Sequence, residues 1–259
     1  MAYSDDRIEA VITCVDYPDF LEQTLPFNLP HLDRVVVVTS FDDDNTRAIC
    51  AKWSVECIST DAFFEKGESF NKGHGINMGL QFMRQNGWML HLDADVVLPL
   101  SFRNMLGKSA LQRDSLYGAA RANVRGWKAW EKIKSKWFTN PQFGHNCLVD
   151  TPAENPMGAT LVHKQYGYCP IGYFQLWHSS YMKRFNIRYP DIQGTAEHDD
   201  VQFALRWSRK NRIQLPTVRV FHLESDDAKM GSNWNGRKTK PFTPDGKPLV
   251  VPEIKAYTY

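Results

Sequence analysis

The sequence lacks any apolar run long enough to cross a membrane, and its longest apolar stretches are short, such as Val35 to Val38. Its opening residues do not show the charged and then apolar pattern of a secretory signal. Five cysteines are present, and no two of them form a C-x-x-C pair. An odd number of cysteines without metal-type spacing favours buried, reduced thiols over disulfides or a zinc site, and therefore a cytoplasmic protein.

The sequence also lacks a large charge imbalance, an internal repeat and a low-complexity segment. Lys and Arg number 31 against 29 Asp and Glu, a formal net charge of +2 in 259 residues. This balance excludes a protein that coats a polyanion with its whole surface, although a local basic patch remains compatible with it. The hydrophobic content of 42% is that of a globular chain, and no shift in composition marks a linker. We therefore expect a single domain.

Strand and helix patterns alternate along the first hundred residues. Strands are predicted over 8–15, 34–39, 55–59 and 88–92, and helices over 19–25, 46–53 and 76–86. The second half is less regular, with a loop predicted over 153–158, a helix over 201–210 and a strand over 217–222. This alternation predicts an α/β protein with a doubly wound, mostly parallel sheet and right-handed crossovers. Ligands of such sheets bind at the carboxyl ends of the strands.

Two carboxylates follow the predicted strand 88–92 directly. Asp93 and Asp95 are separated by one residue and would lie at the carboxyl edge of the sheet. Hard divalent cations bind oxygen ligands and bridge carboxylates to phosphate oxygens, so this D-x-D pattern is compatible with a metal and phosphate site. Taken alone it is equally compatible with an ordinary turn.

Four blocks in order, over roughly residues 8–206, resemble the family 2 glycosyltransferases, which have the GT-A fold. They are residues 11–21 at the first strand, 71–80 at a helix start, the D-x-D pattern, and 198–206, which resembles the E-D-x-D-L-x-x-R block of the family. The resemblance implies a GT-A, Rossmann-like mixed sheet in a single domain. It further implies a nucleotide-binding half over 1–100, an acceptor half over 101–225 and a lid or tail over 226–259.

The resemblance also assigns residues to a nucleotide-sugar donor, with a UDP-sugar expected. Thr13 belongs to the first block, which holds the nucleoside, and Asp16 and Asp43 would lie near the uracil or ribose. Lys72 and Asn77 would lie near the diphosphate or ribose, and Asp93 near the ribose or the metal. Asp43 is also compatible with a solvated turn, and Asn77 with an ordinary polar position on a helix.

The fourth block implies the catalytic base. Asp200 aligns with the catalytic Asp of the family, and a carboxylate there would accept the proton of the acceptor hydroxyl. The block departs from the family pattern, because Asp199 replaces a Glu and Gln202 replaces the second Asp. A shifted register would make Asp199 the base. Acids at a helix start also complement the helix dipole, which is the structural alternative for both residues.

The resemblance implies a metal held by Asp95, Asp93 and a histidine. His222 follows the predicted strand 217–222 at a position where many GT-A enzymes place a third metal ligand. An imidazole beside two carboxylates suits Mn²⁺ better than Mg²⁺. The other histidines at 74, 91 and 178 are expected to be structural. The expected reaction is a single displacement that inverts the anomeric centre while the metal stabilises the leaving diphosphate.

A basic stretch lies in the predicted acceptor half. Six cations, including Arg121 and Arg125, are set against one acid, Glu131, and are interleaved with Trp127, Trp130 and Trp137. Basic residues with aromatics suit a nucleic-acid backbone with splayed bases or a sugar-stacking platform. An amphipathic helix that buries its indoles gives the same pattern. Residues 172–177 could form a wall of an acceptor pocket, although Trp177 and its aromatic neighbours equally fit a core.

The tail adds Trp234, Arg237 and Lys238 in a Gly- and Asn-rich basic segment that could close over a ligand as a lid. With the basic acceptor half, this tail looks like the phage-type glycosyltransferases associated with TET/base-J hydroxylases. That looser resemblance implies a 5-hydroxymethylpyrimidine in DNA as the acceptor, reached by base flipping. The alternatives are a glycan glycosyltransferase of the same fold and a non-catalytic nucleic-acid or sugar-binding module. A nucleotidyltransferase would require a Gly-rich phosphate loop, which residues 13–18 do not provide.

Overall fold

The first strand and helix show how the sequence builds the sheet. The computed structural model describes residues 7–65, 70–139, 161–191 and 198–224. Strand β1 (Ile8–Thr13) is buried along its whole length. Helix α1 (Pro18–Asn28) begins at a proline, whose missing N–H is not needed in a first helical turn.

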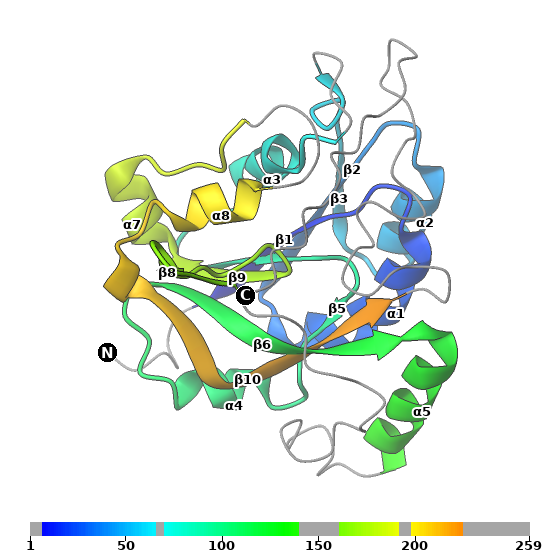
Figure 1. Ribbon diagram of the computed structural model, residues 1–259. Helices are drawn as coiled ribbons and strands as arrows, with labels where there is room; N and C mark the ends of the chain where they lie inside the picture. Colours follow the sequence, from blue (N-terminus) through cyan, green and yellow to red (C-terminus); the bar gives the residue numbers. More distant parts are fainter. Residues whose placement is uncertain (1–6, 66–69, 140–160, 192–197, 225–259) are drawn as a thin grey trace.

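Eight strands form one mixed sheet in the order β3-β2-β1-β4-β9-β6-β10-β5 (Figure 1). The remaining strands of this sheet are β2 (Arg34–Thr39), β3 (Glu56–Ser59), β4 (Trp88–Leu92), β5 (Val96–Val97), β6 (Leu116–Arg125), β9 (Phe174–His178) and β10 (Arg212–Glu224). Strand β9 runs antiparallel to both of its neighbours, β4 and β6, and β5 runs antiparallel to β10. The other pairings are parallel. The predicted mostly parallel α/β sheet in one domain is confirmed.

Helices cover both faces of the sheet (Figure 1). One face packs against α3 (Lys72–Gln81), α7 (Ser179–Phe185) and α8 (Asp199–Ala204). The other face packs against α1, α2 (Asp44–Lys52), α4 (Phe102–Gly107) and α5 (Gly126–Thr139). The short elements are η2 (Leu29–His31), η4 (Arg209–Asn211) and a separate hairpin of β7 (Val162–His163) and β8 (Gly167–Tyr168).

The helix predicted over 201–210 is wrong in its boundaries. Helix α8 begins at Asp199 and ends at Ala204, and η4 follows it. Trp207 is buried and stacks on Tyr181 with a centroid distance of 5.3 Å. Packing of this indole against α7 accompanies the end of the helix. The loop predicted over 153–158 lies outside the described residues.

Strands β6 and β10 pair in parallel with an irregular register. Arg212 pairs with Leu116 and Gln214 with Gly118, but Arg219 pairs with Ala120. Five residue steps along β10 therefore correspond to two along β6. Beyond this bulge the pairing is regular and places His222 opposite Asn123.

His31 offers a test of how burial affects stability. Burial, together with the nearby charge of Arg103, lowers its pKa from 6.5 to about 4. The unfolded chain therefore binds a proton here at a higher pH than the folded chain, so the free energy of unfolding should fall as the pH drops through this range. One proton gives a slope of at most about 1.4 kcal/mol per pH unit. We expect His31→Gln to flatten this slope in urea unfolding measured between pH 6.5 and 4. Equal slopes in both proteins would contradict the prediction.

Candidate active site

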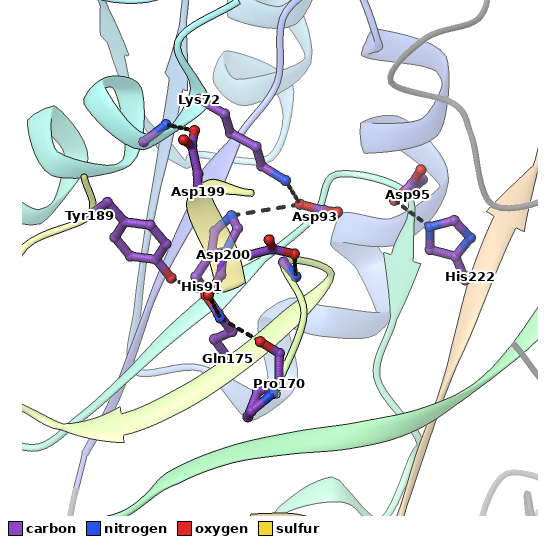
Figure 2. A network of polar contacts seen from close by, with 12 residues as sticks. Lys72, His91, Asp93, Asp95, Pro170, Gln175, Tyr189, Asp199, Asp200 and His222 are labelled. Atoms are coloured by element: carbon purple, nitrogen blue, oxygen red, sulfur yellow. Dashed lines mark hydrogen bonds and ion pairs between the residues drawn. The ribbon is translucent and has the colours of Figure 1, made fainter. Parts of the chain in front are cut away.

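The polar residues of interest gather where β4 and β10 end and where α3 and α8 begin (Figure 2). Because β1, β4, β6 and β10 run parallel to one another or share neighbours in one sheet, their carboxyl ends lie along one edge. Asp93 and Asp95 follow β4 directly, and His222 lies near the end of β10. Side chains far apart in sequence therefore meet at this edge.

Asp95 and His222 form a buried pair. The Nε2 atom of His222 lies 3.6 Å from Oδ1 of Asp95, and the two residues are only 5% and 7% exposed respectively. The backbone sets this contact, because His222 pairs with Val96 and the N–H of Leu223 donates to the carbonyl of Asp95 at 2.8 Å. Burial, with the positive charge of Arg121, lowers the pKa of His222 to about 3, so its imidazole is neutral.

Asp93 is directed toward Lys72 rather than toward this pair. The Nζ atom of Lys72 lies 2.5 Å from Oδ1 of Asp93, and Nε2 of His91 lies 3.6 Å from the same oxygen. Burial raises the pKa of Asp93. For Lys72, burial acts to lower the pKa, but the carboxylates of Asp93, Asp200 and Asp95 outweigh this effect, and the pKa is raised. Lys72 therefore stays a cation.

The structure does not bring the three expected metal ligands into one cluster. Among the described residues, no group of three or more His, Cys, Asp or Glu side chains could hold a metal ion. The two carboxylates of the D-x-D pattern have different partners, Lys72 for Asp93 and His222 for Asp95. Asp93 is therefore a partner of Lys72. Asp95 and His222 are the two residues of metal-ligand type that lie together, and we call them the metal-type pair.

Asp95 and His222 fit the kind of metal that the sequence predicts. A carboxylate oxygen and a neutral imidazole are ligands that Mn²⁺ accepts, whereas Mg²⁺ prefers oxygen ligands alone. The Nδ1 atom of His222 is buried without a hydrogen-bond partner among the described residues. Two protein ligands leave coordination positions for phosphate oxygens of a ligand.

The neighbouring acids Asp199 and Asp200 have different surroundings. Asp199 is 2% exposed, and its Oδ2 accepts from the N–H of Gly73 at 2.7 Å, which ties α8 to the first turn of α3. Asp200 is half-buried, and it accepts from the N–H groups of Gly172 and Val201, both at 2.6 Å. Successive helix residues project about 100° apart, which separates the two carboxylates. Asp199 therefore connects α8 to α3, whereas Asp200 faces Lys72 and Gly172.

Burial raises the pKa of Asp200, while its hydrogen bond from Gly172 and the charge of Lys72 act in the opposite direction. A carboxylate with a raised pKa accepts a proton more readily than an ordinary surface carboxylate. The pKa of Asp93 is raised as well, but Asp93 is paired with Lys72, and this leaves Asp200 as the acid whose environment suits a general base.

Gln175 binds the backbone of Asp200, and the sequence analysis assigned it no role of its own within the segment 172–177. Its Nε2 donates to the carbonyls of Pro170, at 2.8 Å, and Asp200, at 3.0 Å. Its Oε1 accepts from the hydroxyl of Tyr189 at 2.5 Å (Figure 2). The amide is fully buried, and both of its N–H groups and its oxygen have partners. It therefore fixes the loop before β9 relative to the start of α8. A polar residue at the centre of an apolar strand, here between Phe174 and Leu176, is the signal that could have identified it.

Gly172 leaves no room for a side chain beside Asp200. A Cβ atom added there would lie 3.2 Å from Oδ2 and 3.3 Å from Cβ of Asp200. We expect Gly172→Ala to displace the carboxylate by a few tenths of an ångström and to lower kcat for a reaction at this site about tenfold. Binding of UDP should change by less than about twofold, because the change is local to Asp200. Gly107→Ala, at an exposed position that ends α4, is the matched control. Wild-type kcat in Gly172→Ala would contradict the prediction.

The residues expected near the nucleoside have mainly structural contacts. Asp43 is buried, caps α2 by accepting from Thr46 N–H at 3.0 Å, and also accepts from Asp16 N–H at 2.7 Å. Asp16 lies in the left-handed region with φ 58°, in the turn after β1, close to Thr13 at the end of that strand. The amide of Asn77 exchanges two hydrogen bonds with the backbone of Tyr189, at 2.9 and 3.0 Å. These contacts supply structural roles for Asp43 and Asn77.

The residues expected near the acceptor are spread over three regions. Arg121 and Arg125 lie on β6, the second of them exposed at its end. Trp177 has no exposed surface and packs on Phe203 with a centroid distance of 5.0 Å, so it belongs to the core. Trp234, Arg237 and Lys238 lie outside the described residues.

The basic stretch after β6 forms the amphipathic helix α5. Trp130 is buried, and Trp127 packs on Phe20 with a centroid distance of 4.8 Å. Lys128, Lys132 and Lys136 are exposed at four-residue spacing, on the face away from the core. The described tryptophans of this stretch therefore serve core packing, and its exposed residues include the three lysines together with Glu131.

Searches against known proteins connect the chain to a fold rather than to a family. No protein-family model and no curated protein matches the sequence. Solved structures do match, including glucosyl-3-phosphoglycerate synthase from Mycobacterium tuberculosis with Mn²⁺ and UDP-glucose, at a TM-score of 0.50 and 14% identity over 87% of this chain and 73% of that chain. The same enzyme with Mn²⁺, UDP and glucosyl-3-phosphoglycerate gives a TM-score of 0.49 and 14% identity over 85% and 71%. A further mycobacterial protein gives 0.47 and 13% over 85% and 66%.

The likeness to the first of these structures shows that the chain has the GT-A fold. The chain spans 66–73% of the length of the neighbours named here. Among the described residues, no helix is long and apolar enough to cross a membrane.

Proposed function

We propose that this chain is a metal-dependent glycosyltransferase that moves a sugar from a UDP-sugar to an acceptor hydroxyl. The observation that carries the proposal is the placement of the buried Asp95–His222 pair and the separate carboxylate of Asp200 at one sheet edge, with the ammonium of Lys72 close to them on Asp93. Two features add support: the GT-A fold, and a structural neighbour with that fold that was solved with Mn²⁺ and UDP-glucose.

Each charged side chain has a part in the proposed reaction. Asp95 and His222 would hold a divalent cation, Mn²⁺ by preference, which when bound neutralises the charge that grows on the leaving diphosphate. The ammonium of Lys72, which pairs with Asp93 in the structure, would exchange part of that contact for a phosphate oxygen. Asp200 would accept the proton of the acceptor hydroxyl while the hydroxyl oxygen attacks the anomeric carbon of the sugar. The bond to the diphosphate breaks in the same displacement, which inverts the anomeric centre.

For the acceptor, we propose a 5-hydroxymethylpyrimidine of DNA as the first candidate to test. The exposed cations of α5, and Arg125 at the end of β6, lie in the predicted acceptor half and support an acceptor with phosphates. The buried position of Trp130 removes one of the aromatics that would stack on bases. A glycan acceptor is the alternative for the same chemistry.

One set of measurements tests both parts of this proposal. Isothermal titration with UDP, with and without Mn²⁺, measures the donor site. Incubation with radiolabelled nucleotide sugars and Mn²⁺, offering hydroxymethylated DNA, plain DNA and oligosaccharides, identifies the transfer and the acceptor. Metal-dependent UDP binding with transfer to any hydroxyl supports the glycosyltransferase. Metal-independent binding, or no binding of UDP, would favour the non-catalytic binding module.

A further inference from the structure

A second polar group, formed by Arg121 and Asn123 of β6, lies beside the Asp95–His222 pair. In the regular part of the β6–β10 pairing, Asn123 is opposite His222 and Arg121 is opposite Val220. Residues in register on neighbouring strands project to the same face of a sheet, and side chains two apart on a strand share that face. Arg121 and Asn123 therefore lie on the face of the sheet that carries His222.

Arg121 presents a guanidinium without a carboxylate partner among the described residues. It stacks on the ring of Tyr173, with Cζ 4.6 Å from the ring centroid, and its Nε is buried without a hydrogen-bond partner there. Tyr173 fixes this position, because its hydroxyl donates to the carbonyl of Ala119 on the same strand. The stacking on Tyr173 thus holds the guanidinium of Arg121 in place, and its N–H groups stay available to donate to a ligand.

Asn123 adds a second unsatisfied group. It is 2% exposed, and its Oδ1 has no hydrogen-bond partner among the described residues. An unpaired polar atom at this depth is costly unless a ligand or water satisfies it. This unpaired oxygen is an acceptor, which suits a hydroxyl of a ligand, whereas the donors beside the Asp95–His222 pair are the guanidinium of Arg121 and the amide N–H groups of Asn123.

The polar group of Arg121 and Asn123 is also close to the base. Tyr173, which carries the guanidinium of Arg121, follows Gly172, whose N–H donates to Asp200. The carbonyl of Tyr173 accepts from the N–H of Asp93 at 3.2 Å. A group bound at Arg121 would thus lie beside Tyr173, the residue that follows the one whose N–H binds Asp200.

We infer that Arg121 and Asn123 form a subsite for an anionic group of the acceptor, a phosphate or a carboxylate carried next to the hydroxyl that receives the sugar. This inference rests on the proposed function. Planar guanidinium groups bind such anions through two parallel hydrogen bonds, and in the proposed reaction the nearby cation Lys72 binds the diphosphate of the donor instead. The anion would orient the acceptor so that its hydroxyl meets Asp200.

The test uses inorganic phosphate as the probe and the full chain saturated with UDP and Mn²⁺. We expect phosphate to bind the wild type, and Arg121→Gln to raise its dissociation constant at least about tenfold. Arg121→Lys should retain part of the binding, because it keeps the charge but not the planar fork, and Asn123→Ala should have a smaller effect than Arg121→Gln. Arg84→Gln, at an exposed position near the opposite edge of the sheet, is the matched control. UDP affinity in each variant reports whether the donor site is intact.

The outcomes separate the two proposals. No metal-dependent UDP binding by the wild type would overturn the proposed function and this inference together. UDP binding without phosphate binding, or phosphate binding that Arg121→Gln leaves unchanged, would overturn the inference alone. Displacement of UDP by phosphate would assign the anion to the donor and would also overturn it.

Acceptor assays then identify the source of the anion. Glycerol, glycerate, glycerol phosphate and hydroxymethylated DNA are offered at equal concentrations to the wild type and Arg121→Gln. Transfer to a small anionic alcohol that depends on Arg121 supports a terminal phosphate or carboxylate, and Arg121-dependent transfer to DNA supports a phosphodiester. Equal transfer to glycerol and its charged relatives, or transfer that is independent of Arg121, would contradict the subsite.

Discussion

Asp200→Asn is expected to lower kcat for sugar transfer by a factor of roughly 10²–10⁴, the range over which general-base catalysis contributes. An amide cannot accept the proton of the acceptor hydroxyl, whereas the half-buried carboxylate with its raised pKa can. Binding of UDP with Mn²⁺ should change by less than about twofold, because Asp200 lies apart from the Asp95–His222 pair (Figure 2). Steady-state kinetics and isothermal titration measure the two effects separately.

Asp199→Asn distinguishes the two possible assignments of the base. Asp199 accepts from the N–H of Gly73, and the amide oxygen of an asparagine can still accept there, so Asp199→Asn should leave kcat close to the wild-type value. The amide in Asp200→Asn loses one of two backbone hydrogen bonds, to Gly172 or to Val201, and the melting temperatures of both variants therefore need to be compared. A larger loss of kcat in Asp199→Asn than in Asp200→Asn would reverse the assignment.

Asp95→Ala is expected to abolish transfer and to weaken Mn²⁺-dependent binding of UDP more than about 100-fold. It removes the carboxylate oxygen that lies 3.6 Å from the imidazole of His222, and so half of the metal-type pair. Losses of 10–100-fold in metal affinity are typical for residues that only support a ligand, so loss of a ligand itself should exceed them. Titration of Mn²⁺ in the presence of UDP measures this change.

The matched variant for this prediction is His222→Ala. It should reproduce the loss of metal dependence, whereas UDP binding without metal should be the same in both variants and the wild type. Wild-type affinity and turnover in Asp95→Ala would remove the metal assignment, whatever the other variants show.

Two parallel strands of the sheet could be predicted from the sequence with accuracy. Strands 34–39 and 88–92 have the observed bounds, because continuous apolar runs between polar turns leave little choice of boundary. Strand β5, with two residues, and the antiparallel insertion of β9 between β4 and β6 were not predicted. Their existence depends on pairing partners that lie far away in the sequence, and local patterns do not carry that information.

The sequence predicted only part of the site, because several of its contacts join segments that lie far apart in the sequence. The proximity of Asp95 and His222 follows from the end of β4 and the end of β10, two positions that strand patterns define. The contact between Lys72 and Asp93 separates the two carboxylates of the D-x-D pattern, and it depends on how α3 meets β4. The contact of Gln175 with Tyr189 and Asp200 likewise links segments that only the folded chain brings together.

The bulge in the β6–β10 pairing has a consequence for the evolution of this chain. Between Gln214 and Arg219, five residue steps of β10 lie beside two of β6, so part of this stretch has no partner in β6. Beyond it, Phe221 and Leu223 pack toward α5 while His222 lies on the opposite face, and this alternation fixes the register. We therefore expect an insertion or deletion of one residue between Gln214 and Arg219 to change the length of the unpaired segment while His222 stays opposite Asn123.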